Sequence, residues 1–212
     1  MTKPKWAWLG MLALLYVGFW GWYGGNGDRL TDAESERLLA RLEQTYGVNR
    51  ATAPPGSLTR NLAEMVRQDD GREFYAVNLE TRKPGQAALA AEAQYSEALL
   101  PILLSRGGHP VFVSERVGLM LGEYGRGIDR VAVVRYRSLR DLLEMAVDPA
   151  MPAAGKHKFA ALAHTEVFIT RPTLTFLHIR LLVGLMLLVL AWAGLAAIDR
   201  LQARRANNPP AG

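Results

Sequence analysis

Two long apolar segments lie near the two ends of the chain and bracket a stretch of mixed composition. Residues 6–23 and residues 181–198 each contain no charged side chain. At about 1.5 Å of rise per residue, each would form about 27 Å of helix, close to the hydrocarbon thickness of a bilayer. The pattern therefore predicts an N-terminal transmembrane anchor within residues 1–27 and a C-terminal transmembrane helix within residues 173–200.

The ends of the first segment favour an uncleaved anchor over a secretory signal peptide. Lys3 and Lys5 precede it, and it ends in bulky rings at Trp22 and Tyr23, where a signal peptidase requires small residues. A helix buried in a protein core is the alternative for either segment. Two uninterrupted apolar runs that end in charged residues favour membrane spans.

Basic residues in the two short tails predict the orientation. Lys3 and Lys5 stand before the first span, and residues 201–212, expected to be a disordered basic tail, carry arginines such as Arg204. The positive-inside rule then places both termini in the cytoplasm and the intervening domain outside it, in a bacterial inner membrane. Arginines on the domain side, among them Arg29 and Arg180, reduce this contrast.

Residues 28–70 predict two short amphipathic helices. Thr31 followed by Glu34 forms a capping box, an apolar stripe follows at helical spacing, and Gly47 ends the first helix. Ser57 is placed to cap the second, which closes before Gly71. These helices could form a collar at the membrane, bind a partner, or pack on their own domain.

Alternating strands and helices follow over residues 71–172. Strands are predicted at residues 73–80, 110–115, 130–136 and 165–170, and helices at residues 87–105, 139–147 and 156–162. The order β-α-β-β-α-β predicts an α+β, ferredoxin-like domain whose four-stranded antiparallel sheet is covered by helices on one face. We assign Phe74, Ala76, Phe112, Val131, Val133 and Ile169 to the uncovered face, and a second copy of the chain is the simplest cover for it.

Several blocks of this domain resemble an uncharacterised bacterial family of the dimeric α+β barrel superfamily, of the type called domain of unknown function 1330. The resemblance covers about residues 70–172. It is carried by residues 73–79, Tyr95 with residues 99–101, residues 106–113, residues 129–138, and Asp148-Pro149 followed by His157. It implies a ferredoxin-like fold and a homodimer, but no established activity. Met151 stands where the family has tyrosine, and Lys158 where it has arginine.

Composition narrows the classes of partner. The chain has 212 residues and a net charge of +5, partly from its tails, without a basic stripe interleaved with aromatic residues. This pattern predicts no nucleic-acid partner and an attraction to lipid headgroups. The chain has no cysteine, which excludes disulfides and thiolate metal sites, and no motif predicts a metal or a cofactor.

Three residues are candidates for a ligand site. Asn78 and Arg135 fall on the two strands expected at the centre of the sheet, and we predict that both point into the barrel interior beneath the uncovered face. His157 is the histidine that fits the family pattern. The alternative is structural: Asn78 ends the strand, and Arg135 pairs with Glu115, Glu123 or Asp129.

Two classes of function remain open. The first is a membrane-tethered, dimerising α+β barrel module that binds a protein partner in the membrane or a small hydrophobic ligand. The second is a small cofactor-free enzyme, monooxygenase-like or isomerase-like, that acts on an aromatic or quinone-like compound. No recognisable catalytic set accompanies the candidate residues, which leaves the catalytic residues unassigned and favours the first class.

Overall fold

The computed structural model describes residues 1–25, 27–174 and 178–207. It divides into two compact units. One comprises Gly24–Thr173, and the other comprises Met1–Tyr23 together with Leu174–Gly212.

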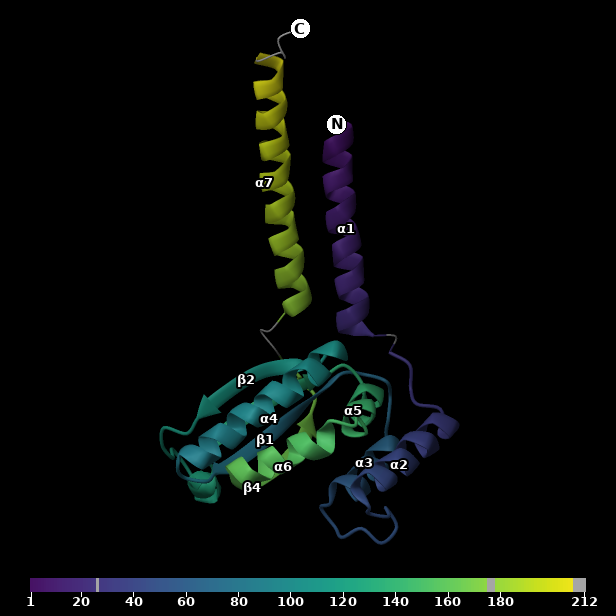
Figure 1. The fold of residues 1–212 in the computed structure, drawn as a ribbon, viewed down its shortest axis with the longest axis vertical. Coiled ribbons are helices and arrows are strands. Elements are labelled where there is room, and N and C mark those ends of the chain that lie inside the picture. Colours follow the sequence, from purple (N-terminus) through teal and green to yellow (C-terminus); the bar gives the residue numbers. More distant parts are fainter. Residues whose placement is uncertain (26, 175–177, 208–212) are drawn as a thin grey trace. The chain divides into compact units, whose positions relative to one another are not determined.

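The larger unit is built on a four-stranded antiparallel sheet. Its strands are β1 (Phe74–Arg82), β2 (His109–Glu115), β3 (Arg130–Tyr136) and β4 (Leu162–Thr170), arranged in the order β2-β3-β1-β4 (Figure 1). The predicted α+β domain with a four-stranded antiparallel sheet is therefore confirmed. β1 and β3 occupy the centre of the sheet because both are rich in β-branched and apolar residues that suit burial on a pleated surface.

Three helices of this unit lie where the sequence predicted them; the first two each differ from the prediction by one residue at one end, and the third begins five residues earlier. They are α4 (Gln86–Ser105), α5 (Leu139–Ala146) and α6 (Met151–Ala161). α6 begins earlier than expected because Pro152 stands in its first turn. The N–H groups of the first turn make no hydrogen bond within the helix, so a proline, which lacks this group, costs nothing there. α4 and α6 lie side by side across one face of the sheet (Figure 1).

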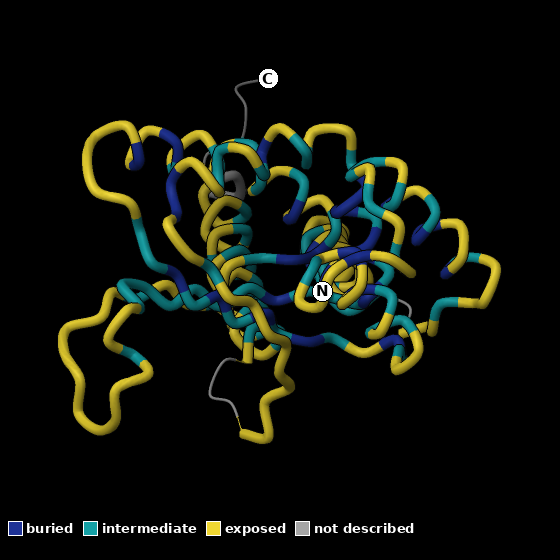
Figure 2. Tube along the Cα trace, turned by 90° about the horizontal axis from the view of Figure 1, so that it is seen from below, coloured by how far each residue is buried: buried dark blue, intermediate teal, exposed yellow. Residues whose placement is uncertain are grey.

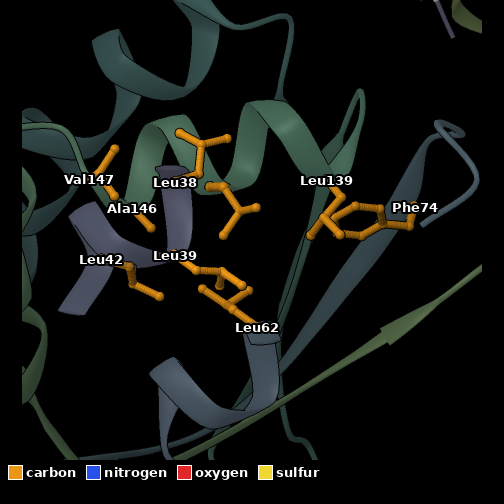
Figure 3. Close-up of a cluster of buried hydrophobic side chains, with 9 residues drawn as sticks. Leu38, Leu39, Leu42, Leu62, Phe74, Leu139, Ala146 and Val147 are labelled. Carbon is orange, nitrogen blue, oxygen red and sulfur yellow. The ribbon is translucent and has the colours of Figure 1, made fainter. Parts of the chain in front are cut away.

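Helices α2 (Asp32–Tyr46) and α3 (Leu58–Val66) share a core with α5 and the start of β1. The predicted capping box of Thr31 and Glu34 is present, and Gly47 ends α2 in the left-handed conformation (φ 66°). Figure 3 shows the leucines of α2 converging with Leu62, Phe74 and Leu139. The helices of residues 28–70 thus pack on their own domain.

The two faces of the sheet differ from the predicted assignment. Along β1, Phe74, Ala76, Asn78 and Glu80 are all buried; we call this side of the sheet the covered face. The prediction that Phe74 and Ala76 belong to the uncovered face is wrong, because strand alternation separates two faces without telling which one the helices cover.

The opposite side, which we call the open face, is apolar at its centre, while Arg135 and Glu166 lie nearer its margins. The register pairs Val77 with Val133 and Leu79 with Val131, so these four side chains lie together on it. Phe112 on β2 and Phe168 on β4 extend the same face to the outer strands. Ile169 pairs with Ala76 and therefore lies on the covered side, contrary to its predicted place.

The smaller unit consists of α1 (Lys3–Gly24) and α7 (Ile179–Asn207). Within the described residues, one helix has the length and hydropathy of a membrane span: Ile179–Arg204 in α7, with a mean hydropathy of 2.6 and an apolar window that is 0% buried. The sequence predicted two such helices. α1 forms as expected, but its tryptophans, tyrosines and glycines lower its mean hydropathy.

Candidate functional site

A polar cluster lies on the covered face, between the sheet and helices α4 and α6. Its members come from β1, β3 and both helices. They are Asn78, Glu80, Glu92, Tyr95, Arg130 and Lys158. Among these, Asn78 is the predicted ligand-site residue, and the structure places it at the centre of the cluster.

The side-chain amide of Asn78 is held by its own strand, by the neighbouring strand β3 and by α6. Its Nδ2 donates to the carbonyl oxygen of Ala132 at 3.2 Å and more weakly to that of Ala76 at 3.4 Å. Its Oδ1 accepts a hydrogen bond from Nζ of Lys158 at 3.1 Å. Because all three bonds are satisfied at once, the orientation of the amide is fixed.

Lys158 reaches this amide from the sheet-facing side of α6. Its ammonium group also lies 5.8 Å from the centre of the Tyr95 ring on α4, within the range of a cation–π interaction. Burial lowers the pKa of Lys158 below its usual value, and the Arg130 charge acts in the same direction, while the Glu80 carboxylate opposes both.

Arg130 is enclosed by two carboxylates at the other end of the cluster. Its Nε donates to Glu80 Oε2 at 2.6 Å, and its Nη1 donates to Glu92 on α4. Glu80 is only 4% exposed, so its charge depends on this pairing. Burial, with the Glu80 carboxylate adding to it, raises the pKa of the Tyr95 hydroxyl to about 12.

Chemically, the cluster has a structural part and a candidate reactive group. Arg130 is occupied by its two carboxylates and holds α4 to the sheet. Lys158 is the candidate, because a buried amine whose pKa is lowered is the kind of lysine that serves as a base or nucleophile in other proteins.

Arg135 belongs to the opposite side of the sheet, so the predicted pairing of Asn78 with Arg135 in one site is wrong. The register places Arg135 beside Tyr75, on the open-face side, where it is 0% exposed. Its Nε donates to Glu73 Oε2 at 2.9 Å and its Nη1 to the carbonyl oxygen of Gly107 at 2.8 Å. The structural ion pair exists, but its partner is Glu73 and not Glu115, Glu123 or Asp129.

The histidines do not form a common site. His157 lies on α6 next to Lys158 in sequence, and successive helical residues point in directions about 100° apart, so the two side chains do not share a direction. His164 lies on β4, not on the same helix as His157. Within residues 1–25, 27–174 and 178–207, no three His, Cys, Asp or Glu side chains are grouped to hold a metal ion.

A separate cavity of about 260 Å³ lies at the end of the sheet where β1 begins and β4 ends. Apolar side chains of α3, β1, α5 and β4 line its floor: Met65, Phe74, Leu139 and Ile169. No sequence pattern predicts this cavity, because its walls come from segments far apart along the chain. It shares no lining residue with the polar cluster.

Comparison with known proteins shows the fold without showing a function. No protein-family model and no curated protein matches the chain. The crystal structure of RPA0582, a protein of unknown function from Rhodopseudomonas palustris, matches with a TM-score of 0.52 and 22% identity over 56% of this chain and 96% of that chain. The methylated form of RPA0582 matches over 59% of this chain and 98% of that chain, with the same TM-score of 0.52 and identity of 22%.

An uncharacterised NIPSNAP-like domain protein from Burkholderia xenovorans is more distant. It covers 50% of this chain and 88% of its own, at 16% identity and a TM-score of 0.33. The sequence resemblance to a particular family stays a prediction. The larger unit of this chain shares the α+β fold of RPA0582, whose function is itself unknown.

Proposed function

We propose that the chain is a membrane-tethered α+β barrel module that dimerises through the open face of its sheet. The observation that carries the proposal is the apolar open face. Phe112 and Phe168 are 54% and 46% exposed at its two sides, with Val77 and Val133 between them. An apolar sheet face of this kind is stable in water only when another layer covers it, and a second copy supplies a matching one.

The anchor rests on the smaller unit. α7 is long and apolar enough to span a bilayer, and α1 runs alongside it. At one end Nζ of Lys5 lies 2.5 Å from the Asp199 carboxylate, and at the other the Tyr16 hydroxyl donates to the carbonyl oxygen of Arg180 at 3.3 Å. These contacts between α1 and α7 support α1 as a second span. The basic residues of the two tails are the basis for placing both termini in the cytoplasm and the barrel outside.

Val133→Asp tests the dimer. The variant places a charge at the centre of the open face, and an unpaired charge in an interface should raise the dimer dissociation constant at least about a hundredfold. Sedimentation of the full chain in detergent measures it. The matched control is Leu89→Asp on α4, a residue that is 52% exposed in the domain. Unchanged association of Val133→Asp, or equal loss in the control, contradicts the proposal.

A small cofactor-free enzyme is the second candidate, and the Lys158–Asn78 contact favours it. A ligand carbonyl or carboxylate oxygen could take the place of Asn78 Oδ1 at the lysine. Mass spectrometry of small molecules that co-purify with the chain tests this. A genuine ligand should be lost in Lys158→Met and retained in Lys156→Met, which changes an exposed lysine of the same helix. Retention in both variants contradicts a site at Lys158.

A further inference from the structure

The loop that connects β2 and β3 carries large apolar side chains that are exposed to solvent. Val117, Met120 and Leu121 are 103%, 103% and 96% exposed. Residues 117–122 contain no charged side chain, while Arg116 and Glu123 flank them. Single exposed apolar side chains are common on protein surfaces. Several large ones on one protruding loop are not, and they indicate a surface that contacts another molecule. We call residues 117–121 the loop tip.

The base of this loop is held in one conformation. The backbone N–H of Arg116 donates to the carbonyl oxygen of Asp129 at 2.8 Å, and its Nε donates to that of Ile128 at 2.7 Å. A short helical turn over Tyr124–Gly127 follows the tip, and the N–H of Ile128 closes it on Gly125 at 3.1 Å. These bonds order the base of the loop and so reduce the part of the conformational entropy loss on binding that comes from the base.

Two contacts show toward which side of the sheet the loop bends. The Tyr124 hydroxyl donates to Glu166 Oε2 at 2.8 Å, and the Thr81 hydroxyl donates to the carbonyl oxygen of Gly127. Glu166 pairs with Leu79, and Thr81 follows Leu79 by two positions, so both belong to the open-face side. Figure 2 shows this loop as the exposed excursion at the lower left, on the side of the sheet away from α4 and α6.

We propose that the loop tip forms a second contact of the homodimer, packing on the partner copy beside its open face. This inference rests on the proposed dimer. Packed sheets lie about 10 Å apart, so a loop that bends to the open-face side meets any sheet placed there. The loop bends to the side of the sheet on which Leu79 and Val131 lie, so a partner that covers that side can contact the tip as well.

The tip lies at the end of the sheet opposite the one from which the chain continues toward α7. β4 ends at Thr170, beside Tyr75, and the chain continues from there toward α7. The tip follows Glu115, which pairs with Arg130 at the opposite end of the strands. The length of a seven-residue strand, about 20 Å, therefore separates the tip from the end of the sheet that leads to α7.

Photo-crosslinking of the full chain in lipid nanodiscs tests the contact. The chain has no cysteine, so Met120→Cys can carry a benzophenone label without other changes. The proposal predicts a covalent product of twice the chain mass. Leu58→Cys on α3, which is 48% exposed, is the control and should give no such product. Label found only on lipid, or only on unlinked chain, overturns the proposal.

A double variant supplies an independent measurement. Met120→Ser combined with Leu121→Ser should raise the dimer dissociation constant about tenfold or more. Its circular dichroism should match the wild type, because both side chains are almost fully exposed. Leu58→Ser with Leu89→Ser is the control pair and should leave the constant unchanged. If the wild type dimerises and Val133→Asp disrupts the dimer while the tip variant does not, the loop contact is wrong and the dimer proposal stands. If the wild type is monomeric, both proposals are wrong.

Discussion

Glu34 shows how one carboxylate joins two parts of the larger unit. It accepts the backbone N–H of Thr31 at 3.0 Å as the second half of the capping box, and it pairs with Arg140 on α5. The hydrogen bond from Arg140, followed by those from Thr31, lowers the pKa of Glu34 to about 2. The charge that starts α2 thus also binds α2 to α5.

The lowered pKa predicts a pH dependence of stability. The folded state holds the Glu34 proton less tightly than the unfolded state, so the contribution is present above the ordinary value of 4.5 and is lost as the pH falls toward 2. In detergent-solubilised full chain, Glu34→Gln should lower the denaturation midpoint at pH 7, and the difference from wild type should vanish near pH 2.

The control is Glu64→Gln on α3, whose ion pair with Arg60 spans one helical turn on an exposed surface. Such a pair contributes little, so its removal should leave the midpoint nearly unchanged at every pH. If Glu34→Gln lowers the denaturation midpoint by the same amount at pH 2 as at pH 7, the ion pair of Glu34 with Arg140 is not the cause of the lower stability.

The residues of the polar cluster were only partly accessible from the sequence. Asn78 was identified because a polar side chain on a central strand requires a partner. Lys158 stood out only as a departure from a family pattern, and its partner lies 80 positions away. Arg130 and Glu80 could have been paired from the strand register, because the two residues are directly opposite in β3 and β1.

At the scale of elements, hydrophobic periodicity located helices α2 to α6 and the four strands of the larger unit, but not the helical turn at Tyr124–Gly127. β3 has the predicted bounds, Arg130–Tyr136, because its β-branched run admits no other structure. The faces of β1 were assigned wrongly: an apolar residue such as Phe74 suits either face of the sheet, so its character does not show on which face it lies. Phe74 is buried against side chains of α2 and α5, which lie far from β1 along the chain.

Because α2 shares the core of the domain, shortening a buried side chain of α2 should lower the stability of the domain strongly. Leu42 is 0% exposed among side chains of α5 and α3. Leu42→Ala should reduce the free energy of unfolding by about 2–5 kcal/mol, because it removes buried methyl groups and leaves a cavity. Chemical denaturation of the full chain in detergent measures this change.

Leu58→Ala is the matched control, since Leu58 belongs to the neighbouring helix but is 48% exposed. Its effect should stay within about 0.5 kcal/mol. Similar values for the two variants would mean that α2 does not share the core of the domain.

At the scale of the whole molecule, the chain joins an α+β domain to apolar helices at both of its ends. Fused reporter proteins that are active on only one side of a membrane test the proposed two-span topology directly. One fused after Gly212 and another inserted at Gly125, in the exposed β2–β3 loop, should report opposite sides of the membrane, with the C-terminal reporter cytoplasmic. Reports from the same side would contradict the two-span arrangement.

The central claim is that two copies of this tethered domain cover each other's open faces. Counting copies in a bilayer tests it most directly. Full chains that each carry one fluorophore are reconstituted at low density, and the photobleaching steps of each spot are counted. The account predicts two steps for the wild type and one for Val133→Asp. Single steps for the wild type would contradict it.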